Sequence, residues 1–376
     1  MTRALEVAIA AGGTAGHINP ALALAEELRS RGHHVTFFGQ TTRLEGTLVP
    51  QEGFDFFPIV VTGFDRSRPW TLVSALVRER SAASAILAHF GESGRPDVAV
   101  GFGAYVELPL VSACHAAGVP LVLHEQNSVP GLANTRSARR AAKVCVSLPQ
   151  AVSAFKDHVR SPEDIVITGN PVRQSVVTAS HAAGRAAFGI PEDATMLLVF
   201  GGSLGAVHLN RGVCALKDEL LGREGLRIVH STGRDDYGSV VAALDLTEAE
   251  QARWQVMPYI SNMGEALAAA DVVVSRAGAS SIAEIAALAV PSLLVPYPFA
   301  TADHQTTNAR YLVDAGAAVL VADDDIDAPT FSEQLVSLVD EPVRRGAMRA
   351  AAQGLGQDRA ATALADQVES VAATRD

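Results

Sequence analysis

Short apolar runs alternate with longer amphipathic stretches along the whole chain. The runs are rich in Val, Ile and Leu and have the length of strands, whereas the Ala-, Leu-, Glu- and Arg-rich stretches between them have the length of helices. This alternation is typical of βα units that feed parallel sheets. We predict strands at residues 5–11, 34–38, 98–100, 121–124, 143–146, 165–167, 196–200, 227–230, 272–275 and 292–295. The pattern predicts an α/β protein in which each half of the chain builds its own parallel sheet.

Three parts are expected along the chain. Residues 1–170 form an N-terminal Rossmann-like domain and residues 171–350 a second one, because the Gly- and Pro-containing segment 169–173 follows a strand-like run and precedes a helical stretch. After Asp327 three helix-like stretches follow without strands between them. We therefore expect residues 351–376 to form a C-terminal helix that packs back on the N-terminal domain.

Composition narrows the class of protein. The 376 residues are 48% hydrophobic and 19% charged, which excludes a disordered acidic chain. A net charge of −11 argues against broad nucleic-acid binding, which requires clustered cations. The three cysteines lie far apart without metal-ligand spacing, as expected in a reducing cytosol.

The first residues carry a charge inside their apolar run and lead into a glycine loop, so they are expected to form a strand and not a secretion signal. Each apolar stretch is interrupted before it could span a bilayer. We expect a protein of the cytoplasmic side whose membrane contact, if any, is peripheral.

The first candidate for chemistry is the loop that follows the first strand. Its residues Gly12, Gly13, Thr14, Ala15 and Gly16 would let the backbone approach an anion, and we expect the next helix to begin with Asn19 as N-cap and Pro20 at its first position. His17 could act as a general base near neutral pH. An ordinary βα turn with a loop-capping histidine is the alternative.

Similar anion-accepting turns recur in the second half. Gly201, Gly202 and Ser203 follow one strand, and the segment from Arg276 to Glu284 follows another. Glu284 could accept ribose hydroxyls, although Ser281 and Glu284 also have capping-box spacing. The polar loop at 297–308 carries Gln305 and offers neutral groups to sugar hydroxyls, unless it is a solvated loop.

One surface segment has an amphipathic pattern. Trp70, Val73 and Val77 share a helical face and have arginines on either side, among them Arg66, Arg68 and Arg78. This pattern is typical of a helix that lies on a membrane, and equally of a helix buried against its own core.

Taken in order, these motifs resemble the MurG family of UDP-N-acetylglucosamine transferases. The resemblance rests on residues 12–17, 101–105, 124–127, 169–173, 201–205, 277–284 and 303–308, and it covers roughly residues 5–320. It implies a GT-B fold, two Rossmann-like domains facing each other across a cleft. It also implies inverting, metal-independent transfer of GlcNAc from UDP-GlcNAc to the MurNAc 4-hydroxyl of undecaprenyl-diphospho-MurNAc-pentapeptide (lipid I), which gives lipid II for peptidoglycan.

The resemblance also implies roles for individual residues. His17 is the proposed base, and Gly13, Gly103, Tyr105 and Glu125 line the acceptor side. UDP-GlcNAc is expected to contact a larger set, in which Ser203 and Arg173 face the diphosphate, Ile260 reads uracil through its backbone, and Asn127 reaches the sugar from the first domain. The set is Thr14, Ala15, Gly16, Asn127, Arg173, Ser203, Ile260, Ala279, Ser280, Ser281, Ile282, Ala283, Glu284 and Gln305.

No metal or cofactor is expected, and the acidic run from Asp323 to Asp325 is interpreted as a solvated loop of the tail. The chain departs from the family pattern at Ala15, Ala104 and Ala277, and alanine disfavours the positive φ that glycine accepts. Expected partners are UDP-GlcNAc, lipid I, the cytoplasmic membrane leaflet and other cell-wall synthesis proteins. A UDP-GlcNAc 2-epimerase and a noncatalytic nucleotide-sugar-binding protein remain alternatives, and the motifs at 101–105 and 124–127 favour the transferase over the epimerase.

Overall fold

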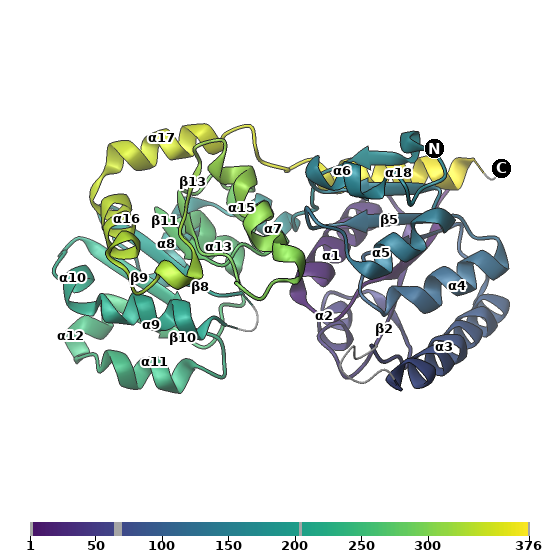
Figure 1. Ribbon diagram of the computed structural model, residues 1–376, viewed down its shortest axis with the longest axis horizontal. Helices are drawn as coiled ribbons and strands as arrows, with labels where there is room; N and C mark the ends of the chain where they lie inside the picture. The colour runs from purple at the N-terminus through teal and green to yellow at the C-terminus, as the bar shows by residue number, and fades with distance from the viewer. Residues whose placement is uncertain (1–2, 64–69, 203–204, 375–376) are drawn as a thin grey trace. The chain divides into compact units, whose positions relative to one another are not determined.

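A computed structural model describes residues 3–63, 70–202 and 205–374 (Figure 1). The chain divides into two compact units, the first made of Met1–Arg173 with Arg359–Asp376 and the second of Gln174–Asp358. The last helix therefore belongs to the first unit. Each unit is an α/β domain with its own sheet, as the alternating pattern predicts.

The first unit contains a seven-stranded sheet in the order β3-β2-β1-β4-β5-β6-β7, in which every pair is parallel. In the centre, Ile9 of β1 aligns with Phe37 of β2 and with Val100 of β4. The strands are β1 (Glu6–Ala10), β2 (His34–Gly39), β3 (Asp55–Pro58), β4 (Val98–Gly101), β5 (Leu121–Glu125), β6 (Lys143–Val146) and β7 (Ile165–Ile167). The strand β3 was not predicted from the sequence.

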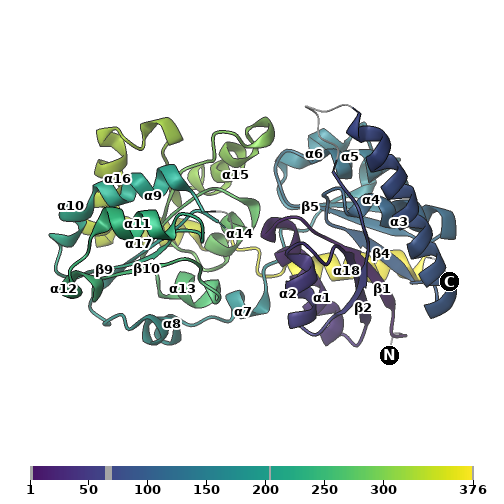
Figure 2. The same ribbon diagram turned by 90° about the horizontal axis from the view of Figure 1, so that it is seen from below.

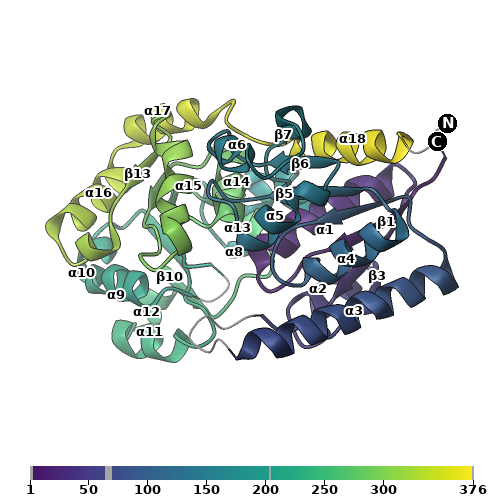
Figure 3. The ribbon, with the colours of Figure 1, turned by 45° about the vertical axis from the view of Figure 1, so that its right-hand side comes forward.

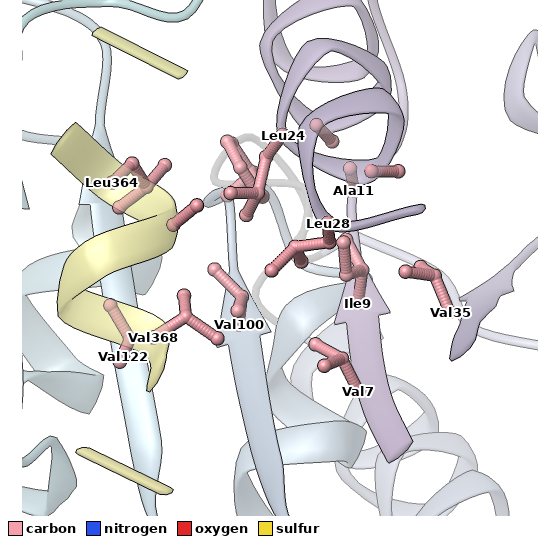
Figure 4. Packing of buried hydrophobic residues seen from close by; sticks show 14 of the residues in the cluster. Val7, Ile9, Ala11, Leu24, Leu28, Val35, Val100, Val122, Leu364 and Val368 are labelled. Carbon is pink, nitrogen blue, oxygen red and sulfur yellow. The ribbon is translucent and has the colours of Figure 1, made fainter. Parts of the chain in front are cut away.

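Alternate residues of β1 supply the two cores of this unit. Val7 and Ile9 pack with α1 and α18 on one face, whereas Ala8 and Ala10 pack with α3 and α4 on the other. Figure 4 shows Leu364 and Val368 of α18 directed at Val100 and Val122, and α3 runs beside α4 in Figure 3. The helices are α1 (Ala15–Ser30), α2 (Glu45–Gln51), α3 (Thr71–Ser93), α4 (Glu107–Ala117), α5 (Leu132–Ser137), η1 (Ala138–Arg140), α6 (Gln150–Phe155), η2 (Pro162–Asp164) and α18 (Ala360–Ala373).

The second unit contains a six-stranded parallel sheet in the order β10-β9-β8-β11-β12-β13. Figure 2 shows α9 and α11 on one side of β9 and β10, with α8 and α13 on the other. The strands are β8 (Thr195–Phe200), β9 (Leu226–Ser231), β10 (Trp254–Met257), β11 (Val272–Ser275), β12 (Ser292–Leu294) and β13 (Ala318–Leu320); β10 and β13 were not predicted.

The helices of the second unit begin after the link at Arg173. They are α7 (Gln174–Val177), α8 (His181–Phe188), α9 (Val207–Ala215), α10 (Lys217–Leu221), α11 (Tyr237–Leu244), α12 (Glu248–Gln251), α13 (Met263–Ala269), α14 (Ala279–Ala287), η3 (Thr301–Asp303), α15 (His304–Val313), η4 (Asp323–Asp325), α16 (Pro329–Asp340) and α17 (Pro342–Ala352). Over the described part of the chain, none of the helices combines the length and apolar character needed to cross a bilayer.

The prediction for the start of α1 is wrong. The helix begins at Ala15, and its N-cap is Thr14, whose backbone is extended, so Asn19 and Pro20 lie inside the helix. Both His17 and Ile18 donate their backbone N–H to Thr14 O, which closes the first turn before Asn19 is reached. Pro20 lies in the second turn of the helix, where it lacks the N–H that would otherwise donate to Gly16 O.

Candidate active site

Loops with phosphate-binding character follow the central strands of both sheets. In each unit the strand order reverses between two adjacent central strands, β1 and β4 in the first and β8 and β11 in the second. The carboxyl ends of such strands are where open α/β sheets bind ligands. The loop at 11–14 follows β1, the loop at 102–106 follows β4, and the loops beginning at Gly201 and Arg276 follow β8 and β11. The predicted motifs therefore lie at the expected edge of each sheet.

His17 lies in the first turn of α1, beside the loop that follows β4. Its Nδ1 is 3.0 Å from Thr14 Oγ1. A Cβ atom built on Gly103 would stand 3.5 Å from the His17 ring and 3.3 Å from the Asn134 amide nitrogen. Because Gly103 also has a φ of +81°, both its backbone shape and its closeness to the ring favour glycine. The structure thus places His17 and Gly103 together, as the resemblance implies.

Two buried carboxylates that were not predicted hold these loops. Glu45, at the start of α2, accepts from Gly13 N–H at 3.1 Å and from Gln40 N–H at 3.2 Å. Glu107, at the start of α4, accepts from Gly103 N–H at 2.6 Å. A Cβ on Gly12 or on Gly101 would come within 2.5 Å of one of these carboxylates, which explains both glycines. The signal in the sequence was a glutamate just ahead of, or within, an apolar helical run.

Burial raises the pKa of Glu107 to about 7, and the nearby Glu125 adds to the rise, although the bond from Gly103 opposes it. The Ser137 hydroxyl approaches the carboxyl group, but Glu107 Oε1 and Ser137 Oγ lack hydrogen-bond geometry to any partner in the described ranges. Glu107 therefore carries its proton for part of the neutral pH range.

Glu125, which the resemblance puts on the acceptor side, is bonded within its own loop in the structure. Glu125 is buried, and its Oε1 accepts from the backbone and side chain of Asn127 while its Oε2 accepts from Gly131 N–H and Asn134 Nδ2. All of these distances lie between 2.8 and 3.3 Å. Because the carboxylate is already saturated with donors, it orders the loop that positions Asn127 and presents no oxygen to a ligand.

The other residues of this edge are placed as follows. Tyr105 lies half-buried, with its hydroxyl 3.3 Å from Gln40 Nε2. His124 is buried, donates from Nε2 to Gly169 O and accepts from Gln126, and burial lowers its pKa to about 4. His124 is thus a neutral structural residue. Ala104 adopts a φ of +60°, so the alanine keeps the glycine-like geometry at a strain cost, whereas Ala15 is helical.

Arg173 is held differently from the prediction. Its guanidinium donates to Glu26 Oε1 from Nε and Nη2, and to Glu52 Oε1 from Nη1 at 2.8 Å. The Arg173 side chain is mostly buried between these two carboxylates, and its bonds lower the pKa of Glu52. A diphosphate would have to displace both carboxylates before it could use this cation.

In the second unit, the start of α14 fits the donor assignment. Gly278 is the N-cap and Ala279 the first helical residue, so Ala279, Ser280 and Ser281 form the first turn. Since Ser281 is not the N-cap, the capping-box explanation of Glu284 does not apply. Ile282, Ala283 and Glu284 are buried in the next turn, and Ala277 is buried. Ser203 lies outside the described residues.

Gln305 is fixed in orientation by its carbonyl oxygen, which accepts from Ala277 N–H at 3.1 Å and from Tyr297 N–H at 3.0 Å. Its amide nitrogen has no partner within the described ranges and is thus presented as a donor. Ile260 packs its side chain in the core, while its backbone forms no hydrogen bond in the part of the chain that is described. Both residues offer the neutral groups expected of a sugar-nucleotide site.

A charged cluster next to these loops was not predicted. Arg276 is buried and donates from Nη1 to Val295 O, to Pro296 O and to Asp323 Oδ1. The other oxygen of Asp323 bonds His208, which also reaches Asp327. Asp323 therefore belongs to the second unit and is not a residue of a solvated tail, because the partners of its carboxylate lie far away in sequence.

The described residues contain no cluster of three or more His, Cys, Asp or Glu arranged to hold a metal ion. The candidate loops of the first unit carry glycines and His17, and those of the second unit carry helix-start amides and the amide of Gln305.

Comparison with known proteins identifies the family. Residues 7–146 match the N-terminal domain of glycosyltransferase family 28, and residues 196–368 match its C-terminal domain. The UDP-N-acetylglucosamine--N-acetylmuramyl-(pentapeptide) pyrophosphoryl-undecaprenol N-acetylglucosamine transferase of Halothermothrix orenii is 36% identical over 98% of this chain and 99% of its own. The protein of the same description from Salinibacter ruber is 38% identical over 99% of this chain and 98% of its own. The crystal structure of Acinetobacter baumannii MurG superposes with a TM-score of 0.72 at 28% identity, covering 97% of this chain and 99% of that one.

The chain belongs to the MurG family. The two parallel-sheet domains of its GT-B fold are those expected from the sequence. Membership accounts for the pairing of a glycine loop and histidine in the first domain with amide-rich loops in the second.

Proposed function

We propose that this MurG-family chain transfers GlcNAc from UDP-GlcNAc to the MurNAc 4-hydroxyl of lipid I, releasing UDP and forming lipid II for peptidoglycan. The observation that carries the proposal is the likeness over the full length to transferases of that description, at 36% and 38% identity. The prepared loops at the carboxyl edge of each sheet support it.

The donor belongs to the second unit in this proposal. The backbone of Ile260 pairs with the uracil edge, and the first turn of α14 receives phosphate with the backbone amides at its start. Glu284 accepts the ribose hydroxyls. The oriented amide nitrogen of Gln305 donates to a GlcNAc hydroxyl.

The acceptor belongs to the first unit. The loop that contains Gly13 and Thr14 and the loop at Gly103 and Tyr105 surround His17. In the proposed reaction His17 takes the proton from the 4-hydroxyl as that oxygen attacks the anomeric carbon from the face opposite UDP. The configuration at that carbon is therefore inverted. Asn127, positioned by Glu125, adds a contact to the sugar.

Negative charge develops on the departing UDP and needs donors that are already oriented. The α14 amides are such donors, and Ser203 is proposed as another. Arg173 could join only by exchanging Glu26 and Glu52 for phosphate, which would link donor binding to a rearrangement in the first unit. The proposed reaction requires no metal ion and no cofactor.

We further propose that the first unit works at the cytoplasmic face of the membrane, where a lipid acceptor lies. Trp70, Val73 and Val77 have exposed fractions of 72%, 68% and 61%, so the alternative of a buried face does not hold for them. Arg66 and Arg68 lie outside the described residues, and Arg78 is exposed on α3. Exposed apolar side chains flanked by cations are suited to an anionic bilayer surface.

The direct test uses labelled UDP-GlcNAc with and without a short-chain lipid I analogue. The transferase forms labelled disaccharide-lipid and UDP in equal amounts, and only when the acceptor is present. Conversion of UDP-GlcNAc into UDP and ManNAc without an acceptor would replace the proposal with the epimerase. Tight binding without turnover under either condition would leave a noncatalytic binding protein.

A further inference from the structure

The start of α9 is tied to a distant part of the second unit by charged hydrogen bonds. His208, the second residue of the helix, has Nδ1 2.8 Å from Asp323 Oδ2 and Nε2 3.3 Å from Asp327 Oδ2. Asp323 and Asp327 follow β13, more than one hundred residues later in the chain. Because both partners are carboxylates, which only accept when ionised, this arrangement favours the protonated imidazole, in which both ring nitrogens donate.

The same face of α9 makes a second close contact with this segment one turn later. A Cβ on Gly212 would overlap Ile326, approaching its Cγ2 to 2.1 Å. Residues four apart lie on the same side of a helix, so His208 and Gly212 together seat α9 on residues 323–327. This contact between α9 and residues 323–327, called the seam below, is therefore extended and is not a single surface ion pair.

From Asp323 the seam continues into the donor loops. Asp323 Oδ1 accepts from Arg276 Nη1 at 2.5 Å, and the same nitrogen donates to Val295 O and Pro296 O at 3.2 and 3.1 Å. Arg276 is followed directly by Ala277, whose N–H holds Gln305, and Pro296 is followed by Tyr297, which holds Gln305 as well. One buried arginine thus joins three loops at the carboxyl edge of the sheet, those after β11, β12 and β13.

We propose that His208 is a positioning residue for the sugar-nucleotide donor. It holds α9, the helix that continues the glycine loop after β8, against Asp323. Asp323 in turn bonds Arg276, which holds the other two donor loops. This inference rests on the proposed function, which places UDP-GlcNAc on these loops. His208 need not touch the donor, since its effect is transmitted through Asp323.

The seam is sensitive to pH through His208. The bond to Asp323 is the largest influence that raises the pKa of His208, and Asp327 adds to it. The bonds from His208 and Arg276 lower the pKa of Asp323, although its partial burial opposes them. Other charged groups on the elements involved are Arg211 on α9, Asp324 and Asp325 in the segment that carries Asp323 and Asp327, and Asp236 at the start of α11, which accepts from Asn210. The stabilising interaction of His208 with Asp323 and Asp327 is fully present below the ordinary pKa of histidine, and it is lost as the pH rises through the raised pKa of His208.

The experiment compares the wild type with two substitutions at this position. His208→Ala removes both donors. His208→Asn keeps a side-chain N–H near the position of Nδ1 but cannot titrate. For each protein, KM for UDP-GlcNAc, kcat and the Kd of UDP are measured from pH 6 to pH 9. The titration of the ligand itself cancels when variants are compared at the same pH.

We expect His208→Ala to raise KM and the Kd of UDP by about fivefold or more at pH 6, the lower end of typical coupling between distinct sites, with kcat at saturating donor little changed. The wild-type KM should approach that of His208→Ala as the pH rises, and His208→Asn should retain tight binding with a flatter pH profile. Wild-type affinity in His208→Ala at every pH would overturn the inference.

A milder variant covers the case in which His208→Ala does not fold. Asp327 is largely exposed, and Asp327→Asn weakens only the longer of the two His208 bonds. Asp327→Asn should raise the KM for UDP-GlcNAc by a smaller factor than His208→Ala does. If this KM depends on pH in the same way in Asp327→Asn, His208→Asn and the wild type, the inference is also overturned. A wild type that fails to bind UDP-GlcNAc would instead contradict the proposed function, so the two failures are distinguishable.

Discussion

At the scale of single residues, buried carboxylates and amides determine what the site presents. Glu45, Glu107 and Glu125 each accept backbone N–H groups from a loop at the carboxyl edge of the first sheet. Gln305 does the same with its carbonyl oxygen in the second. In each case one polar group is consumed in shaping a loop at the carboxyl edge of a sheet. The groups that position the loops are therefore distinct from the groups proposed to contact substrate.

His17→Ala should reduce kcat by about 10²–10⁴-fold, the usual contribution of a general base, while the Kd of UDP-GlcNAc changes little. The reason is that the proposed function places His17 on the acceptor side and the donor on the second unit. Steady-state kinetics and calorimetry measure the two quantities. His34→Ala is the matched control, since His34 is exposed at the amino end of β2. A fully active His17→Ala enzyme would remove His17 from the mechanism.

Gln305→Glu should weaken UDP-GlcNAc more than UDP, by about tenfold in the ratio of the two Kd values. The glutamate can still accept from Ala277 and Tyr297, so the loops remain in place, but the amide donor is gone. The added charge acts on the phosphates of both ligands and cancels in the ratio. Equal losses for both ligands would show that Gln305 does not contact the sugar.

Glu107→Gln should increase stability at pH 8 but not at pH 4.5. Burial raises the pKa of Glu107 from 4.5 to about 7, so its ionisation in the folded state destabilises the wild type progressively between these pH values. Above pH 7 the ionised carboxylate lowers the free energy of unfolding of the wild type by about 3 kcal/mol at most. Urea unfolding at both pH values measures it, with the exposed Glu92→Gln as control. A constant difference across this range would contradict the assignment.

The residue scale also shows where prediction from sequence fails. Motif spacing placed His17, Gly103, Asn127 and Gln305 at the correct edges, because these positions follow from the strand–loop–helix order. It could not reveal that Arg173 is already paired with Glu26 and Glu52, or that Glu125 is saturated by its own loop. The choice of partner for a charged group is decided by tertiary neighbours, which a single sequence does not display.

At the scale of elements, the strands that were predicted and those that were missed differ in burial. The central strands β1, β4, β8 and β11 are continuous apolar runs, because parallel strands are covered on both faces. The missed strands β3, β10 and β13 all lie at sheet edges and are only partly buried. β3 and β10 mix polar and apolar residues and β13 has only three residues, so hydrophobic periodicity alone does not detect them.

The exposed face at the start of α3 leads to a prediction about membrane binding. Val73→Glu should weaken binding to vesicles that contain anionic lipid by roughly tenfold, because it places a negative charge within the apolar surface. Co-sedimentation with vesicles measures the binding. Val343→Glu, at another exposed valine in the second unit, should bind as the wild type does. Equal effects of the two substitutions would show that α3 has no special role.

At the scale of the whole molecule, the two units share one α/β architecture but carry different functional groups at the ligand-binding edges of their sheets. Both sheets reverse their strand order next to a glycine loop, so each unit has a ligand-binding edge. The first unit adds a histidine near neutral polar groups and an exposed apolar helix start, whereas the second adds helix-start amides and an oriented glutamine. This asymmetry is what a transferase needs, since one substrate carries a lipid and the other a nucleotide.

The most direct test of this account is the linkage formed in the reaction of UDP-GlcNAc with a short-chain lipid I analogue in excess EDTA. The account predicts full activity and a product in which GlcNAc is β-linked to the MurNAc 4-hydroxyl, as determined by proton NMR. Loss of activity that added metal restores would contradict metal-independent charge neutralisation by the protein. An α-linked product would contradict direct in-line attack, and the absence of any disaccharide would contradict the proposed function itself.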